Sequence, residues 1–205
     1  WTYDWTVTNG GGGSATVSIT AQDLAGNSND TATNNTVTVD NTAPTISTVS
    51  SDGAFFNAGM HTITVKFSEP LATAPKIAIN AVGSVDDITA TDMTASTTDN
   101  LAWTYNYSIT QPSSDGTATI TLSDGADVAG NVMTSDNSHT FVIDTTDPTM
   151  SISSPTVNSV VHETNGEIPF TFTATDATSQ ITCAYEVGTG GFTDLPNCTS
   201  PQTLT

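Results

Sequence analysis

Two stretches of alternating aromatic and polar residues constrain the fold of this chain more than any other feature. Residues 1–8 read WTYDWTVT and residues 103–110 read WTYNYSIT. In each, an apolar side chain occupies every second position, which is typical of a strand that buries one face. Further period-two apolar runs, separated by turn residues, occur at 17–21, 37–39, 63–67, 120–122, 141–143 and 170–174. The chain is therefore predicted to be all-β, with antiparallel sheets packed face to face as sandwiches.

The repeated text also predicts the domain organisation. DLAGN at 23–27 recurs as DVAGN at 127–131, and each motif is followed seventeen residues after its Asp by another, Asp40 or Asp144. The two motifs lie 104 residues apart, which matches the length of one sandwich. We expect three segments, of which the first and last are partial domains. They are the C-terminal part of a sandwich at 1–42, a complete sandwich at 43–146 and the N-terminal part of a sandwich at 147–205.

Two interpretations of the partial domains remain open. The chain is either a window from a long tandem array, or a subunit whose front part is completed by strands of the next copy. In both cases the expected partners are neighbouring domains or copies of itself, arranged head to tail. An isolated copy would leave strand edges unpaired and cores half covered, which proteins avoid.

The charge balance excludes several classes of partner. The formal net charge is −19, because 21 acidic residues face only Lys66 and Lys76. Nucleic acid and anionic membrane surfaces are therefore unsuitable partners, whereas cations are favoured. No apolar run is long enough to span a bilayer. Scattered acids such as Asp86, Asp87 and Asp99 are expected to be solvated surface groups.

The region from Asp40 to the second linker resembles a known family. It contains DNTAPT at 40–45, ITVKFSEPL at 63–71, SDGADVAGN at 123–131 and FVIDTTDPT at 141–149. These motifs are similar to the bacterial immunoglobulin-like repeats of surface adhesins and S-layer proteins. The C-terminal segment, with TCAYEVGTGGF at 182–192, resembles a cysteine-bearing subtype. The resemblance implies an extracellular or cell-surface location, rigid spacers, and in many members calcium at the joints between domains.

Two groups of oxygen-bearing residues are candidate calcium ligands. Ca²⁺ takes six to eight oxygen ligands from carboxylates, amides and main-chain carbonyls. The motif loop and the later Asp are expected to return to the same end of a sandwich, and Glu69 could reach the first joint from the next domain. The predicted sets are Asp23, Asn27, Asp40 and Glu69 at the first joint, and Asp127, Asn131, Asp144 and Asp147 at the second. The alternative is that Asp and Asn merely form Asx turns, with Gly26 and Gly130 at positive φ.

Cys183 and Cys198 flank a Gly-rich turn between two strand-like runs. A disulfide between them would contribute about 3 kcal/mol by loop entropy and would indicate an oxidising compartment. Two free thiols are the alternative.

An enzyme is not predicted. His61, His139 and His162 are the only imidazoles, and none has a spacing that pairs it with a nucleophile or a second metal ligand. The Gly-rich tract at 9–14 lacks the Lys and the helix of a phosphate-binding loop, so it is expected to be a hairpin tip.

The alternative function is adhesion to carbohydrates or to host surface proteins. Exposed aromatic side chains can form sugar-stacking platforms, although the alternation around Trp1, Trp5 and Trp103 favours packing in a core. Sequons for N-glycosylation occur at Asn29, Asn34, Asn106 and Asn197. Asn106 is expected to point outward, because Tyr105 and Tyr107 are expected to point inward.

Overall fold

The computed structural model describes residues 2–8, 12–29, 35–111, 115–156, 158, 160, 168–175, 181–186, 190–195 and 202–204. The chain divides into two compact units, Trp1–Thr145 and Thr146–Thr205. Among the described residues the only helical element is the short 3₁₀ turn η1 (Val82–Ser84), and all other regular structure is β. The predicted all-β, antiparallel fold is confirmed. No helix in this part of the chain has the length and apolar character needed to cross a membrane.

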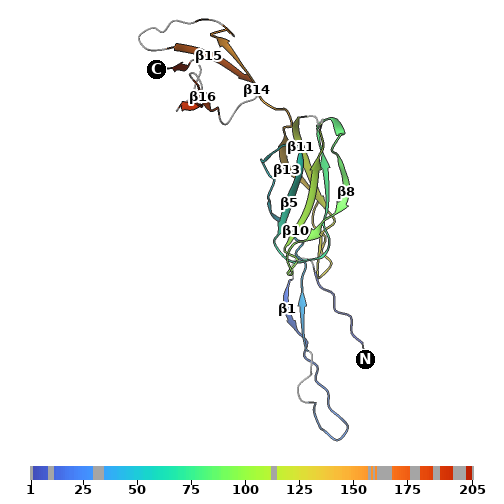
Figure 1. The fold of residues 1–205 in the computed structure, drawn as a ribbon. Helices are drawn as coiled ribbons and strands as arrows, with labels where there is room; N and C mark the ends of the chain where they lie inside the picture. Colours follow the sequence, from blue (N-terminus) through green and yellow to red (C-terminus); the bar gives the residue numbers. More distant parts are fainter. Residues whose placement is uncertain are drawn as a thin grey trace. The chain divides into compact units, whose positions relative to one another are not determined.

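The first unit contains a two-sheet sandwich. One sheet has the strand order β3-β5-β10-β9, and the other has the order β4-β13-β11-β7-β8. In Figure 1, β5 and β10 lie side by side in one layer, and β11 and β13 lie side by side in the other. All pairings are antiparallel except that of β4 with β13. The strands are β3 (Ile46–Val49), β4 (Phe55–Phe56), β5 (Gly59–Phe67), β7 (Lys76–Asn80), β8 (Ile88–Asp92), β9 (Thr94–Ala95), β10 (Ala102–Ile109), β11 (Gly116–Ser123) and β13 (Asp136–Ile143).

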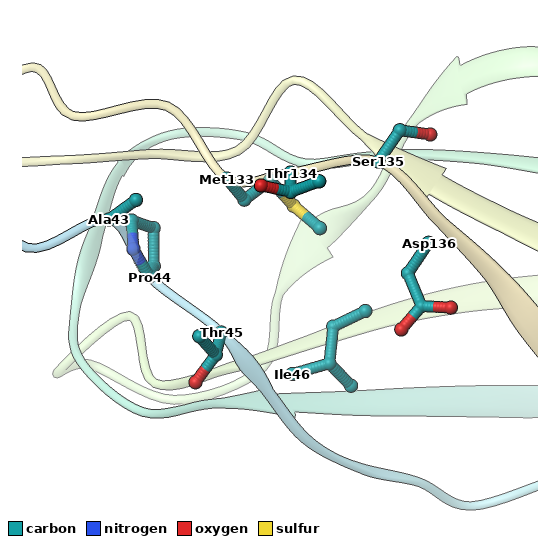
Figure 2. Close-up of a pocket in the computed structure, with 8 residues that line it drawn as sticks. All are labelled: Ala43, Pro44, Thr45, Ile46, Met133, Thr134, Ser135 and Asp136. Atoms are coloured by element: carbon teal, nitrogen blue, oxygen red, sulfur yellow. The ribbon is translucent and has the colours of Figure 1, made fainter.

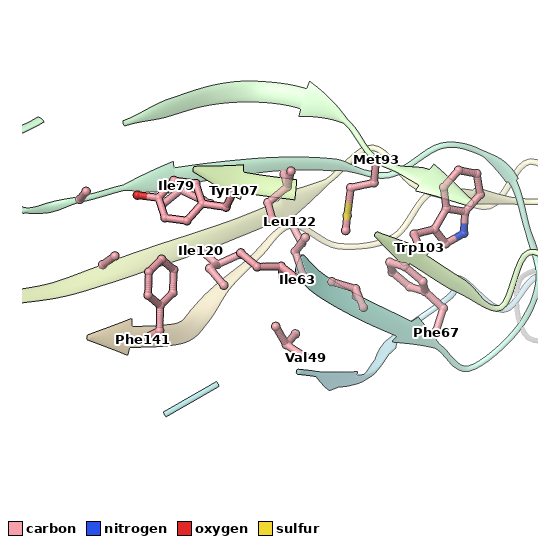
Figure 3. Packing of buried hydrophobic residues seen from close by; sticks show 14 of the residues in the cluster. Val49, Ile63, Phe67, Ile79, Met93, Trp103, Tyr107, Ile120, Leu122 and Phe141 are labelled. Carbon is pink, nitrogen blue, oxygen red and sulfur yellow. The ribbon is translucent and has the colours of Figure 1, made fainter. Parts of the chain in front are cut away.

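The core lies between these sheets and follows the period-two pattern. Ile63, Val65 and Phe67 of β5 are buried, and so are Ile120 and Leu122 of β11. Tyr107 and Phe141 meet across the two layers with ring centroids 5.6 Å apart in an edge-to-face arrangement. Figure 3 shows the labelled side chains, among them Ile63, Ile120 and Phe141, pointing into the space between the strands. Burial of one face of each strand therefore holds the sandwich together.

The predicted core position of Trp103 and the outward position of Asn106 are confirmed. The Trp103 side chain is 7 % exposed, and its Nε1 donates to the Asn100 carbonyl at 3.0 Å. Asn106 is exposed on the opposite face of β10, where its Oδ1 accepts from Thr62 Oγ1 at 2.9 Å.

The expectation that Asp86 is a solvated surface acid is wrong. Asp86 is buried and its Oδ1 accepts from the amide and the hydroxyl of Thr110, at 3.1 and 2.9 Å. Its carbonyl accepts from the Tyr107 hydroxyl at 3.0 Å. Burial and the nearby carboxylates of Asp86 and Asp87 raise the pKa of Tyr107, so its hydroxyl stays protonated and serves as a donor. Through these hydrogen bonds, Asp86 ties the segment after η1 to the end of β10.

Near the N-terminus, a short hairpin pairs β1 (Gly13–Thr16) with β2 (Thr36–Val39) in the register Gly13↔Val39 to Thr16↔Thr36. Residues 2–8 were predicted to form a strand like β10, but they belong to no sheet in the described structure. β10 pairs with β5 and β9, whereas no described strand lies beside residues 2–8. Trp5, predicted to pack in a core, is accordingly 55 % exposed, and Trp1 lies outside the described residues.

The strand predicted at 17–21 is not formed: β1 spans Gly13–Thr16, and beyond it the Val17 amide donates to the Asn35 carbonyl at 2.6 Å. Val17 and Ile19 are exposed. No described sheet covers the face on which they lie, so burial supplies no stabilisation to extend the strand.

The second unit is a smaller set of strands. β14 (Thr149–Ser154) pairs with β15 (Ile168–Thr175), which pairs in turn with β18 (Gln202–Leu204). β16 (Cys183–Tyr185) and β17 (Thr193–Leu195) form a separate hairpin. In the β14–β15 pair, Met150 lies opposite Ala174, much as Ile46 lies opposite Phe67 in the sandwich. The assignment of residues 147–205 to the front part of a further sandwich stays a prediction.

Candidate metal centre

In the second DxAGN motif, the first residue, Asp127, and the last residue, Asn131, hydrogen-bond to each other and close the loop. Asp127 Oδ1 accepts from the Asn131 amide at 2.8 Å, and Asp127 Oδ2 accepts from Asn131 Nδ2 at 2.8 Å. The Asp127 amide in turn donates to the Asn131 carbonyl at 3.1 Å, and Gly130 adopts φ +93°. The loop is anchored by β12 (Ala126–Asp127), which pairs with β6 (Leu71–Thr73). The Asx-turn interpretation of this motif is therefore correct as far as the loop itself is concerned.

The same loop also holds the linker that opens the sandwich. Asn131 Nδ2 donates to the main-chain oxygen of Asp40 at 3.0 Å, across 91 residues of sequence. The Asp40 side chain accepts from the Thr42 amide at 3.0 Å, which turns the chain toward Pro44, a buried residue. Asp40 directly follows β2, so this contact fixes where the N-terminal hairpin joins the sandwich.

Three carboxylates meet at this junction. Asp40, Glu69 and Asp127 each offer one oxygen, and these oxygens all lie within 4.8 Å of one another. Glu69 comes from the turn between β5 and β6. Asp127 is 3 % exposed, while Asp40 and Glu69 are half-buried. In the described part of the chain, no Lys or His forms an ion pair with any of the three.

The electrostatics of the cluster are unfavourable without a cation. Burial raises the pKa of the Glu69 carboxyl, and repulsion by Asp40 and then by Asp127 raises it further. The pKa of Asp127 is instead lowered, chiefly by the hydrogen bond from the Asn131 side chain. Asp127 is thus held as a carboxylate beside a Glu69 whose charge is disfavoured. A bound dication would instead favour the charged form of Glu69 and lower the pKa of its carboxyl.

The donor set fits a hard dication. Ca²⁺ binds oxygen at about 2.3–2.6 Å, so two ligands on opposite sides of the ion lie about 4.8 Å apart. The three carboxylate oxygens fall within that limit. All three donors are anionic oxygens, which suits calcium or magnesium and not a soft metal. Asp40, Glu69 and Asp127 would hold the ion, and water or main-chain carbonyls would complete its shell.

The predicted grouping of these residues into two sets is wrong. Asp40 and Glu69 of the first set meet Asp127 and Asn131 of the second. β13, which separates Asp127 from Asp144, pairs with β11 from Leu122↔Asp136 to Gly116↔Ile143. Its eight residues carry the chain about 26 Å, to the opposite end of the sandwich. Asp144 therefore lies at the other end from Asp127, and its amide donates to the Phe56 carbonyl.

The same reasoning separates Asp23 and Asn27 from Asp40. The β1–β2 register places Asp40 next to the Gly13 end of the hairpin, whereas the 23–27 loop lies beyond the Thr16 end. Asp147 is an exposed residue of the second unit. The seventeen-residue spacing between the motif Asp and the later Asp could have indicated this separation. It contains a single strand, which carries the chain away from the motif loop and does not return it.

The remaining predicted sites have separate outcomes. Cys183 has no free thiol, but Cys198 lies outside the described residues, so their pairing stays a prediction. Asn29 Nδ2, the atom that a glycan would modify, donates to the Ile19 carbonyl at 2.9 Å. Asn34 and Asn197, like His162, lie outside the described residues.

The two described histidines have structural contacts. His61 stacks on Phe56 with ring centroids 4.1 Å apart, and its Nε2 lies 2.8 Å from the Asn57 carbonyl. His139 Nδ1 lies 3.2 Å from Asp52 Oδ2. Both rings therefore contribute to the packing and hydrogen bonding of β4, β5 and β13.

A shallow cavity lies beside the linker (Figure 2). Ala43, Pro44, Thr45 and Ile46 form one side of it, and Met133, Thr134, Ser135 and Asp136 face them from the other. Its volume is about 220 Å³, which is below the usual range for sites that bury a small-molecule ligand. The cavity separates the linker from the segment that leads into β13.

The sequence matches the family model of the bacterial Ig-like domain (group 3) over residues 1–89 and again over 99–191. The chain belongs to this family. Each match begins at or just before an aromatic segment and runs across a linker, so the repeat defined by the family spans the junction at Asp40 or at Asp144. No curated protein matches the chain. The predicted resemblance to bacterial Ig-like repeats is confirmed.

Proposed function

We propose that this chain is a non-enzymatic structural part of an extracellular or cell-surface protein, in which Ig-like modules act as rigid spacers and calcium stiffens the joints. Bacterial Ig-like domains typically occur in extracellular or surface proteins and are generally non-catalytic, which supports the location and the structural role. The observation that carries the proposal is the cluster of Asp40, Glu69 and Asp127, which joins a linker to a sandwich.

The proposed mechanism is a charge-controlled joint. Asp40 belongs to the linker after β2, whereas Glu69 and Asp127 belong to the sandwich. Without a cation, repulsion among the three carboxylates opposes docking of the linker, and the hydrogen bond from Asn131 to Asp40 opposes its release. A bound Ca²⁺ cancels the repulsion and ties both sides together. The joint then keeps one angle, as a spacer requires.

The proposed partners are neighbouring Ig-like modules or further copies of this chain, arranged head to tail. Two matches to one family in a single chain support a tandem arrangement. The exposed apolar side chains of the N-terminal segment also support it. In the repeat, Trp5 corresponds to Tyr107 and Val37 corresponds to Phe141, and both of these counterparts are buried in the core of the sandwich. Adhesin, filament and S-layer assemblies are the candidate contexts.

Calcium titration by isothermal calorimetry tests the proposal. The wild-type chain should bind Ca²⁺ at this joint, and Glu69→Gln should remove one equivalent of binding, because it removes one of the three carboxylate ligands. Glu69 accepts no hydrogen bond among those found in the described structure, so the substitution should leave the fold intact. Asp92→Asn is the matched control, since Asp92 is an exposed acid at the end of β8. Equal binding by the wild type and Glu69→Gln would refute a site at this joint.

A second candidate function is adhesion to carbohydrates or host surface proteins. Tyr3 and Trp5 are exposed aromatic residues, as a sugar-stacking platform requires. Trp5, however, corresponds in the repeat to Tyr107, which is fully buried in the core. Saturable binding to a glycan array that Trp5→Ala abolishes would favour adhesion over the spacer role.

A further inference from the structure

The two DxAGN loops have the same internal geometry. In the first loop, Asp23 Oδ1 accepts from the Asn27 amide at 2.8 Å, and Asp23 Oδ2 accepts from Asn27 Nδ2 at 2.7 Å. The corresponding distances in the second loop, between Asp127 and Asn131, are both 2.8 Å. Gly26 and Gly130 adopt φ +88° and +93°. The first loop is therefore formed to the same shape as the second.

The two loops differ in what covers them. Asn131 Nδ2 has a second acceptor, the main-chain oxygen of Asp40, and Asp127 is buried beside the linker. Asp23 and Asn27 are both exposed, and no described segment lies on the first loop as the linker lies on the second. A preformed loop of this geometry thus presents the same donor, Asn27 Nδ2, to solvent.

The residues around the first loop are uncovered in the same way. TVTVD at 36–40 corresponds to TFVID at 140–144, yet Val37 is 45 % exposed whereas Phe141 is 1 % exposed. Trp5 is 55 % exposed whereas its counterpart Tyr107 is fully buried. In the sandwich, Phe141 packs against Tyr107 and against Phe56 of β4, a strand that follows the docked linker. The described part of segment 2–40 therefore has the loop and the apolar positions of the sandwich, and these are exposed where the sandwich covers them.

We infer that the Asp23–Asn27 loop is a docking site for the opening linker of an Ig-like module, a segment of the type Asp-Asx-Thr-x-Pro like residues 40–44 of this chain. The Asn27 side-chain amide donates to the main-chain oxygen of the linker Asp, as Asn131 does to Asp40. The linker Asp carboxylate then lies beside Asp23, as Asp40 lies beside Asp127. This inference rests on the proposed role of the chain in an array of modules, and it assigns the surface that receives the neighbouring segment.

Nuclear magnetic resonance of the full ¹⁵N-labelled chain tests this inference with a synthetic peptide of the sequence TVDNTAPT, residues 38–45. The peptide should shift the amide signals of Ala25, Gly26 and Asn27 and the side-chain amide of Asn27, in a saturable manner. The side-chain amide of Asn131 is an internal control and should not move, because the chain's own linker already occupies it. A peptide of the same composition in scrambled order is the second control.

The variant Asn27→Ala should abolish the peptide-induced shifts, whereas Asn57→Ala, at an exposed position between β4 and β5, should leave them unchanged. Absence of shifts at 25–27 up to millimolar peptide, or equal shifts with the scrambled peptide, would overturn the inference. These outcomes are independent of the calcium titration. Normal calcium binding at Glu69 without peptide binding at Asn27 would refute the docking site and leave the proposed joint intact.

Discussion

Replacing Glu69 by Gln should change the stability of the sandwich in opposite directions with and without calcium. At 4.8 Å, the outer limit of the cluster, two unit charges repel by about 0.9 kcal/mol even with the dielectric constant of water. Glu69 faces two carboxylates, Asp40 and Asp127, so removing its charge should stabilise the calcium-free sandwich by about 1–2 kcal/mol at low ionic strength. That gain corresponds to a rise in Tm of roughly 5–15 °C for a domain of this size.

Calcium should reverse the order of the two proteins. A ligand present at about 100 times its Kd stabilises the folded state by about 2.7 kcal/mol. The wild type should gain this amount and Glu69→Gln should gain little, so that the wild type becomes the more stable protein. Differential scanning calorimetry in EDTA and in excess CaCl₂ measures both differences, with Asp92→Asn as the control. If Glu69→Gln lowers Tm equally in EDTA and in CaCl₂, the charge of Glu69 neither destabilises the calcium-free sandwich nor binds calcium.

Three further predictions concern the charge of Glu69, the hydrogen bonds of Asn131 and the packing of the core. First, the raised pKa of Glu69 means that the native state binds a proton more readily than the unfolded state; calcium-free stability should therefore rise as pH falls from neutrality toward the ordinary Glu pKa of about 4.5, and circular-dichroism melts of Glu69→Gln should lose this rise. Second, Asn131→Ala removes the hydrogen bonds to Asp127 and to Asp40 and should cost about 1–3 kcal/mol in urea denaturation, whereas Asn27→Ala at the matching exposed loop should leave the midpoint of the sandwich unchanged. Third, Leu122→Ala in the core should cost about 2–5 kcal/mol, while Val128→Ala at an exposed loop position should stay within about 0.5 kcal/mol; equal urea midpoints for these two variants would contradict the assigned core.

Much of the fold could be predicted because period two is a direct signal of which face a strand buries. Ile63, Val65 and Phe67 alternate with polar residues in the sequence, and all three are buried in β5. The same signal failed for Trp5, since alternation identifies a face and cannot tell whether another sheet covers it. Burial of Asp86 was not predictable from local sequence either, because its partner Thr110 lies 24 residues away.

The candidate site was predictable in its residues and not in its grouping. Asp40, Glu69 and Asp127 were identified by residue type and by their position in turns or linkers, which are local properties. Their meeting at one end of the sandwich depends on strand direction, and β13 lies between Asp127 and Asp144. The contact between Asn131 and the Asp40 carbonyl involves a main-chain atom, which every residue has, so no pattern of side chains indicates it.

We propose that a cation holds the Asp40 linker against the sandwich at a fixed angle. The most direct test is a distance distribution measured by pulsed electron spin resonance, with spin labels at Thr38→Cys on β2 and Thr117→Cys on β11, both exposed positions. The distribution should be broad in EDTA, should narrow to a single distance when calcium is added, and should stay broad in Glu69→Gln. A distribution with the same width in EDTA and in calcium would contradict it.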